Sequence, residues 1–287
     1  MNVDDVLILE ADDAGTLRSP VMLIALTGLF DIAGAATTAL DEFAPAESAV
    51  TVGEIEPDPF YDFTQERPQV ELDDGEIRVI RWPENRFDIV RGLGTRDLVV
   101  LVGVEPHLYW PTYVACIQRV AQRLGCEAVV TVGASAEAVP HTRTPLVTGS
   151  TNDADLARRL GVGQPTYQGV TGVAGVIQTV LADTGIPSVS LRVGVPHYLM
   201  NAEHPQAVQA LVRHLSHVLD VPNTTDLSDQ IDGWRDVHDE LVANDEQLRM
   251  YVNLLEAEFD RRSEAQIPTA DDLGAQFEEF LRTQRDD

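Results

Sequence analysis

The stretch DLVVLVGV, residues 97–104, decides the fold class of this chain. Its nearly continuous apolar run, without polar alternation, is typical of a strand buried on both faces of a parallel sheet. Residues 111–124 then repeat apolar side chains at helical spacing, between Pro111 as a start signal and Gly125 as a stop signal. A second apolar strand follows at residues 128–132. Strand, helix and strand in this order predict a crossover between parallel strands.

The same alternation of short apolar runs with helical patterns continues in both directions. Further strands are predicted at residues 6–9, 21–26, 48–55, 75–80 and 189–193, and further helices at residues 33–43, 154–160, 172–184 and 205–219. Repetition of this unit predicts an α/β fold with a three-layer, mainly parallel sheet that is covered by helices on both faces.

Toward the C-terminus the strand pattern stops and only helical patterns remain. Residues 226–262 carry apolar side chains at three- and four-residue steps throughout, and residues 271–282 carry another apolar stripe beyond a break at Pro268. Because tryptophan, phenylalanine and leucine recur in phase, we expect a helical tail that folds back on the domain or packs on a second subunit. The sequence therefore predicts an α/β domain at residues 1–221 and a helical C-terminal extension at residues 222–287.

The composition is strongly acidic. The formal net charge is −27, from 47 acidic residues against 20 basic ones, and every basic residue is an arginine. Such a field repels nucleic acid and anionic membranes, which bind clustered cations. We expect either a solvated acidic surface or an acidic face that docks a basic partner.

The two cysteines and the apolar runs bear on the compartment. Cys116 and Cys126 are ten residues apart in one predicted helix, which separates them too far for a disulfide. The chain has no signal-peptide pattern and no apolar run of membrane-spanning length. We therefore expect a soluble protein of the reducing cytoplasm.

The segment ALTGLFDIAGAATTAL, residues 25–40, joins a strand to a helix through a glycine-containing turn. Its glycines at positions 28 and 34 do not have the GxGxxG spacing of a dinucleotide site, and no Gly-Lys-Ser/Thr follows them. The pattern does not favour a nucleotide cradle. We expect Asp31 to cap the helix instead, because a carboxylate accepts backbone N–H groups and suits the dipole there.

Three Pro-His pairs, at residues 106–107, 140–141 and 196–197, each follow an apolar strand by a few residues. Seven histidines and sixteen prolines would seldom form three such pairs by chance. The carboxyl ends of parallel strands meet at one edge of a sheet, where open α/β folds bind ligands. The candidates for a ligand cleft at this edge are Asp31, Glu105, His107, His141, Arg143, Thr148 and His197.

These residue types suit several kinds of chemistry. Histidine exchanges protons near neutral pH, the Arg143 fork suits a carboxylate or phosphate, and Glu105 suits a base or an orienting group. The chain has no GxSxG, HExxH or CxxC motif, so its catalytic residues stay unassigned. The three histidines lie in different loops, which does not support a metal site, and we expect no cofactor. A passive small-molecule pocket and purely structural Pro-His turns remain as alternatives.

Four segments together resemble the proteasome assembly chaperone 2 family, in its high-GC bacterial branch. They are PVMLIALTGLFDIAGAATTAL, DLVVLVGVEPHLYW, VVTVGASAEAVPHTRTPLVTGS and YQGVTGVAGVIQTVLADTGIPSVSLRVGVPHYL, and the resemblance covers residues 1–220. The Gly-aromatic-x-Asp-x-Gly turn of that family corresponds loosely to Gly28, Phe30, Asp31 and Gly34. Here Leu29 and Phe30 precede Asp31, and Ala33 intervenes before the second glycine.

The resemblance implies a three-layer fold of the phosphorylase/hydrolase-like type with a helical C-terminal extension. Eukaryotic members of that family pair with a partner chaperone and hold proteasome α-subunits during ring assembly. Archaeal relatives form homo-oligomers that bind proteasome or related assembly intermediates. The resemblance implies no catalytic residue.

Three functional hypotheses follow from these observations. The first is a non-enzymatic, homo-oligomeric assembly chaperone or interaction factor, a trimer or a dimer, with a protein client. The second is a small-molecule-binding protein or a hydrolase/phosphorylase-like enzyme that uses the Pro-His edge, and the third is a sensor whose pocket controls association. An open polar cleft at that edge would favour a ligand or catalysis, whereas an edge filled by side chains and C-terminal helices would favour a scaffold.

Overall fold

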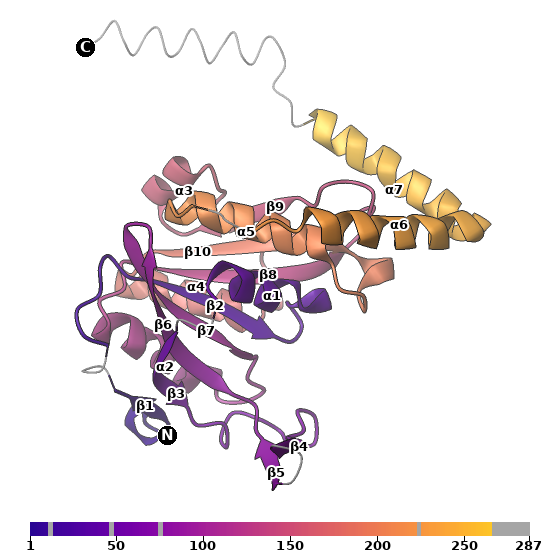
Figure 1. The fold of residues 1–287 in the computed structure, drawn as a ribbon. Helices are drawn as coiled ribbons and strands as arrows, with labels where there is room; N and C mark the ends of the chain where they lie inside the picture. Colours follow the sequence, from indigo (N-terminus) through magenta and orange to yellow (C-terminus); the bar gives the residue numbers. More distant parts are fainter. Residues whose placement is uncertain (11–13, 46–48, 74–76, 223–224, 266–287) are drawn as a thin grey trace, which may run out of the picture.

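A single eight-stranded sheet forms the centre of the computed structural model, which describes residues 1–10, 14–45, 49–73, 77–222 and 225–265. The four middle strands, in the order β7, β2, β8 and β10, are parallel (Figure 1). Antiparallel pairing adds β6, β3 and β1 on one side and β9 on the other. From edge to edge the strands are Leu7–Leu9 (β1), Val50–Ile55 (β3), Asn85–Leu93 (β6), Arg96–Val104 (β7), Val21–Thr27 (β2), Ala128–Glu137 (β8), Ser188–Pro196 (β10) and Val147–Thr151 (β9).

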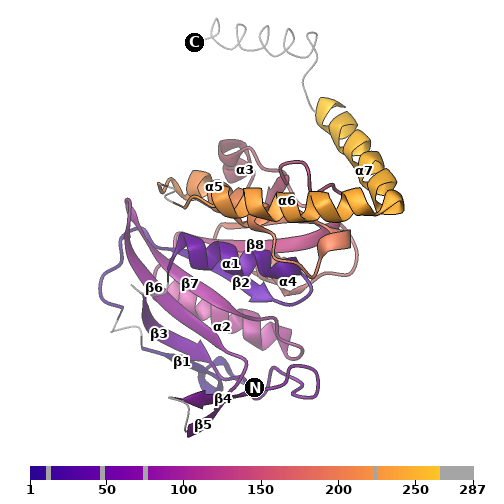
Figure 2. The same cartoon turned by 45° about the vertical axis from the view of Figure 1, so that its right-hand side comes forward.

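Helices cover both faces of this sheet. Helices α1 and α5 pack on one face, and α2 and α4 pack on the other (Figures 1 and 2). The helices are Ala35–Phe43 (α1), Trp110–Arg123 (α2), Ala154–Leu160 (α3), Val173–Thr184 (α4), Pro205–Leu219 (α5), Ser228–Asn244 (α6) and Glu246–Ala265 (α7). The prediction of a three-layer α/β fold with a helical C-terminal extension is confirmed.

Burial on both faces explains why the middle strands are apolar at almost every position. In β2, Leu23 and Ala25 pack against the layer of α1 and α5, while Met22 and Ile24 pack against the layer of α2 and α4. All four side chains are at most 2% exposed. The quoted strand at residues 97–104 behaves in the same way, because successive side chains of β7 enter opposite layers.

The sequence patterns missed three strands, and all three lie outside the parallel centre. β6 and β9 pair antiparallel and mix polar residues and glycine with apolar ones, which hides the pattern of a buried strand. The third, Gln69–Asp73 (β4), pairs with Ile77–Arg81 (β5) in a separate two-stranded hairpin. In Figures 1 and 2 this hairpin projects from the end of the molecule opposite α6 and α7.

The C-terminal helical pattern over residues 226–262 forms two helices with a break at Asp245. α6 ends at Asn244 and α7 begins at Glu246. The Asp245 carboxylate accepts hydrogen bonds from the backbone N–H groups of Gln247 and Leu248 at 2.9 and 3.0 Å, and it thereby caps a new helix. α6 packs along α5, and α7 leaves its end at an angle (Figure 2). The predicted stripe at residues 271–282 lies outside the described residues.

The cysteines are unbridged, but they do not share a helix as the sequence predicted. α2 ends at Arg123, and Cys126 lies beyond Gly125, whose φ of +66° stops the helix. Burial raises the pKa of the Cys116 thiol to about 11 and that of Cys126 to about 12. Among the described helices, none has the length and apolar character needed to cross a membrane.

Candidate functional site

The three Pro-His pairs follow β7, β8 and β10, so all three leave the sheet at the same edge, as strand direction predicted. The structure nevertheless divides the candidate residues into separate local settings. His141, Arg143 and His197 contact the C-terminal helices α6 and α7. The other four candidates bond to neighbouring parts of the α/β domain.

Asp31 caps α1, as expected. Its Oδ1 accepts hydrogen bonds from the backbone N–H groups of Ala36 and Thr37 at 2.7 and 3.3 Å, and its Oδ2 accepts one from the Thr37 hydroxyl at 2.7 Å. The residue is only 7% exposed. Both carboxylate oxygens are therefore occupied by the helix that the turn introduces.

Glu105 joins the end of β7 to the start of α4. Its Oε1 accepts a hydrogen bond from the backbone N–H of Val173, the first residue of α4, at 2.9 Å. The preceding Gly172 packs so closely on the Phe30 ring that an added Cβ would lie 2.6 Å from a ring carbon. Glu105 thus has a structural role at a helix N-terminus, where its negative charge is favourable.

His107 and Thr148 lie in two further settings. The backbone N–H of Asp62 donates to Nδ1 of His107 at 3.1 Å, and the His107 N–H donates to the carbonyl oxygen of Phe60 at 2.9 Å. Thr148 is in the edge strand β9, where its hydroxyl donates to the carbonyl oxygen of Arg192 at 3.3 Å. These contacts fix a loop on the β7 side and a strand edge on the β10 side, respectively.

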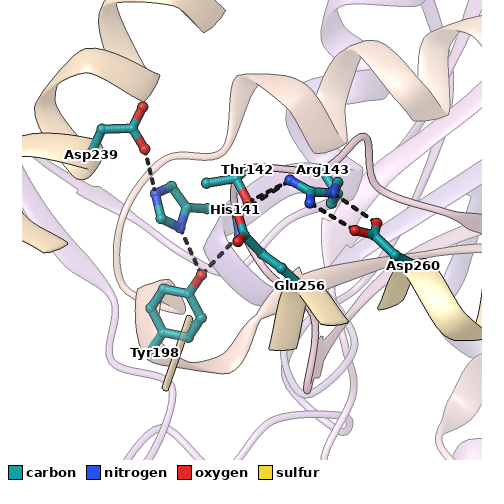
Figure 3. Close-up of polar contacts among 7 residues, drawn as sticks. All are labelled: His141, Thr142, Arg143, Tyr198, Asp239, Glu256 and Asp260. Atoms are coloured by element: carbon teal, nitrogen blue, oxygen red, sulfur yellow. Dashed lines mark hydrogen bonds and ion pairs between the residues drawn. The ribbon is translucent and has the colours of Figure 1, made fainter. Parts of the chain in front are cut away.

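His141 is enclosed by a loop tyrosine and by α6 (Figure 3). It is 1% exposed, its Nδ1 lies 2.7 Å from the hydroxyl of Tyr198, and its Nε2 lies 3.1 Å from Oδ1 of Asp239. The same tyrosine oxygen accepts the backbone N–H of His141 at 2.9 Å. A neutral imidazole that accepts from the phenol and donates to Asp239 satisfies all three partners.

Burial sets the ionisation of this pair. It lowers the pKa of His141 below its ordinary value, and the hydrogen bond and charge of Asp239 only partly oppose that effect. Burial also raises the pKa of Tyr198 to about 12. Both rings are consequently neutral at physiological pH.

Aromatic stacking extends the contact between α6 and the α/β domain. Trp234 of α6 lies between His204, which precedes α5, and His238, with ring centroids 4.4 Å apart on each side. His204 is 2% exposed, and burial lowers its pKa to about 4. Its Nδ1 accepts the backbone N–H of Ala207 at 3.2 Å, which caps α5. Ring contacts of Trp234 therefore hold α6 against the start of α5.

Arg143 is held by two carboxylates of α7 (Figure 3). Its Nε and Nη2 donate to the two oxygens of Asp260 at 2.9 and 2.8 Å, and its Nη1 donates to Oε1 of Glu256 at 3.2 Å. The Thr142 hydroxyl also donates to Glu256. The bonds to Asp260 raise the pKa of the guanidinium and lower that of the carboxylate. This is a planar bidentate pair with a second carboxylate beside it.

His197 completes the contact with α7. It begins the short 3₁₀ turn that follows β10, and its Nδ1 lies 3.0 Å from the carbonyl oxygen of Glu137. With Nδ1 donating to that carbonyl, Nε2 accepts the hydroxyl of Tyr251 at 3.1 Å. The two rings meet edge to face, with centroids 5.6 Å apart.

The residues that fill this edge were not among the sequence candidates. They are Tyr198, Trp234, His238, Asp239, Tyr251, Glu256 and Asp260. Two signals were present, since Tyr198 adjoins a Pro-His pair and the two α7 carboxylates are four residues apart on one helix face. Neither signal specifies a partner without the path of the chain after α5.

The arrangement is a packed polar network. His141 has no exposed face from which to exchange a proton with a substrate, because Tyr198 and Asp239 occupy both ring nitrogens. Within the described residues, no group of three or more histidine, cysteine, aspartate or glutamate side chains could hold a metal ion. A surface hollow at the ends of β6 and β7, which Trp82 and Arg67 help to line, involves none of the seven candidates.

Comparison with known proteins places the chain in a family. A sequence profile of the PAC2 family matches residues 25–242. The crystal structure of a PAC2 family protein from Streptomyces avermitilis is 33% identical, with a TM-score of 0.74, and the match covers 81% of this chain and 99% of that one. A proteasome-assembly chaperone homologue from Mycobacterium tuberculosis is 35% identical, with a TM-score of 0.71 and the same coverage of both chains.

More distant structures share the fold. An archaeal proteasome activator from Pyrococcus furiosus is 16% identical, with a TM-score of 0.62, over 83% of this chain and 96% of that one. A search of curated proteins found no match. Since the family profile spans most of the sheet and its helices, and two relatives exceed 30% identity over most of the chain, this chain belongs to the PAC2 family.

Proposed function

We propose that this protein is a non-enzymatic assembly factor that binds a protein client. The observation that carries the proposal is the occupancy of the Pro-His edge: His141, Arg143 and His197 are each hydrogen-bonded to side chains of the C-terminal helices. A filled edge leaves an enzyme no access to these groups, whereas a scaffold needs only a stable surface.

The relative from Mycobacterium tuberculosis, a proteasome-assembly chaperone homologue, suggests the client. On that basis we propose that the client is a proteasome subunit or an assembly intermediate, bound in the cytoplasm. The acidic surface, with its net charge of −27, suits a client with a basic docking face. In this proposal residues 1–221 form the scaffold, and residues 222–287 form an extension that modifies it.

We further propose that the protein acts as a homo-oligomer, a trimer or a dimer. The β4–β5 hairpin supports this proposal, because isolated two-stranded hairpins are marginally stable in water. Register places Val70, Leu72 and Ile80 on one face of the hairpin, and their exposed fractions are 53%, 62% and 55%. A second copy that covers this face would bury all three side chains.

The test is quantitative capture of the tagged protein from its own cells under native conditions, followed by mass spectrometry. We expect proteasome subunits in stoichiometric amounts, and precursor forms should be enriched over mature ones. Recovery of the protein alone, without any proteasome subunit, would count against the proposal. A metabolite panel screened in parallel by thermal shift should show no stabilisation, and a binder lost in the His141→Ala variant would favour the small-molecule alternative.

A further inference from the structure

The contacts of Arg143 come from a part of the chain outside the family profile. Arg143 and Thr142 lie within the profile, which ends at residue 242, whereas Glu256 and Asp260 lie beyond it on α7. The part of the chain that the profile matches therefore presents a guanidinium and a hydroxyl at its edge, and α7, beyond the profile, supplies the two carboxylates that bind them.

α7 packs on the domain outside its two hydrophobic cores. Its buried apolar side chains, Val252 and Leu255, belong to neither core cluster, while Met250 and Leu254, one turn apart on the outer side, are 61% and 65% exposed. A single residue, Asp245, separates it from α6. Since α7 supplies no strand and no residue of either core cluster, it can move away while the cores of the α/β domain keep their packing.

We propose that the edge formed by Thr142, Arg143 and His197 is a binding site for an acidic amphipathic helix of a protein partner, and that α7 is its internal occupant. The inference rests on the proposed function in one respect, that a protein partner exists. α7 itself defines the chemistry of the ligand, because it supplies hydrogen-bond partners to Thr142, Arg143 and His197.

The geometry specifies the spacing of the recognised groups. One carboxylate binds the Arg143 fork in bidentate fashion, and a second, one turn earlier, accepts hydrogen bonds from Nη1 of Arg143 and from the Thr142 hydroxyl. An aromatic hydroxyl further back along the helix, at the position of Tyr251, donates to His197. Helical spacing places Tyr251 on one side of the buried pair Val252 and Leu255, and places Glu256 and Asp260 on the other side.

The overall charge makes this local pairing necessary. With a net charge of −27 the protein repels an acidic helix at long range, so attraction must come from contacts made after docking. Attraction between overall charges therefore cannot drive binding of an acidic helix. A scrambled peptide of equal charge is the appropriate control, because it keeps the charge and removes the spacing of the recognised groups.

The test uses the full-length chain and a fluorescent peptide with the sequence of residues 246–265. The E256Q/D260N variant frees Arg143 from its internal partners, and the R143Q/E256Q/D260N variant is its matched control. In fluorescence anisotropy we expect the peptide to bind the double variant at least about tenfold more tightly than it binds the triple variant or the wild type, which corresponds to about 1.4 kcal/mol. Equal affinity for the double and triple variants, or equal binding of the scrambled peptide, would overturn the proposal.

A second measurement applies if the double variant does not fold. In the single variant Arg143→Gln we expect amide hydrogen exchange to accelerate at least tenfold in α7, while β2, β7 and β8 stay unchanged. Unchanged exchange in α7 would also overturn the proposal. Neither measurement involves a proteasome subunit, so these results can fail while capture of the client succeeds, and the reverse can also occur.

Discussion

Replacement of Asp31 by alanine should destabilise the fold substantially, because this carboxylate caps α1 from a buried position. The substitution removes the acceptor of the backbone N–H groups of Ala36 and Thr37 and of the Thr37 hydroxyl. Loss of a helix cap costs about 0.5–2 kcal/mol, and each buried donor left without a partner costs about 1–3 kcal/mol. Since part of the loss is shared between these contributions, we expect about 2–4 kcal/mol in total.

Urea unfolding followed by circular dichroism measures this loss. With an m-value of about 3 kcal/mol/M, the upper end for small proteins, the midpoint should fall by about 1 M. Asp31→Asn keeps an oxygen acceptor for the amides and should lose about half as much, and Thr37→Val should lose about 1 kcal/mol. A stability of Asp31→Ala within about 0.5 kcal/mol of the wild type would contradict the capping role, and it is the result expected for a residue reserved for a ligand.

Three other measurements address ionisation and association. Burial holds the pKa of His204 at about 4, against 6.5 as the ordinary value, so the unfolded chain binds more protons between these two pH values. The free energy of unfolding should therefore fall by roughly 3 kcal/mol as the pH drops from 6.5 to 4. The His204→Asn variant, which retains a cap acceptor, should show a smaller pH dependence of that free energy. An unchanged pH dependence in the variant would contradict the lowered pKa of His204. Because burial raises both thiol pKa values, Ellman's reagent at pH 8 should label Cys116 and Cys126 about 100-fold more slowly in the native protein than in the unfolded chain. Rapid labelling of the native protein would contradict this prediction, because it would show that the thiols are accessible as thiolates. Leu72→Arg should shift the mass measured by light scattering toward that of the monomer, whereas Ile77→Arg, on the opposite face of the hairpin, should not. An unchanged mass in both variants would show that the hairpin is not part of the subunit interface.

The parallel centre of the fold was predictable from the sequence because its strands are buried on both faces. Every position of β2 from Val21 to Ala25 is apolar and buried, so the pattern needs no knowledge of the rest of the chain. The flanking strand β6 gives no such signal, since it combines Phe87 and Ile89 with Arg86 and Asp88. The break at Asp245 was hidden for a different reason: the apolar spacing continues across it, and only the local capping bonds interrupt the helix.

Strand direction predicted which residues lie at the edge of the sheet, but it did not predict their side-chain partners. Direction correctly placed the three Pro-His pairs at one edge, and the capping role of Asp31 followed from its position before a helix. The partners of His141 and Arg143 are separated from them by about a hundred residues of sequence, at Asp239 and Asp260. Because the sequence has 47 acidic residues, charge complementarity alone does not identify which of them pairs with Arg143.

The proposed assembly role is tested most directly by reconstitution with purified proteasome subunits from the same organism. The full-length protein would be mixed in one sample with unassembled α- and β-subunits and in another with mature proteasome. Native mass spectrometry would then measure the masses of the complexes in each sample. We expect a complex of fixed stoichiometry with the unassembled subunits or their intermediates, and faster formation of the mature particle. If the protein remains separate from every subunit and leaves the assembly rate unchanged, the proposed function is wrong.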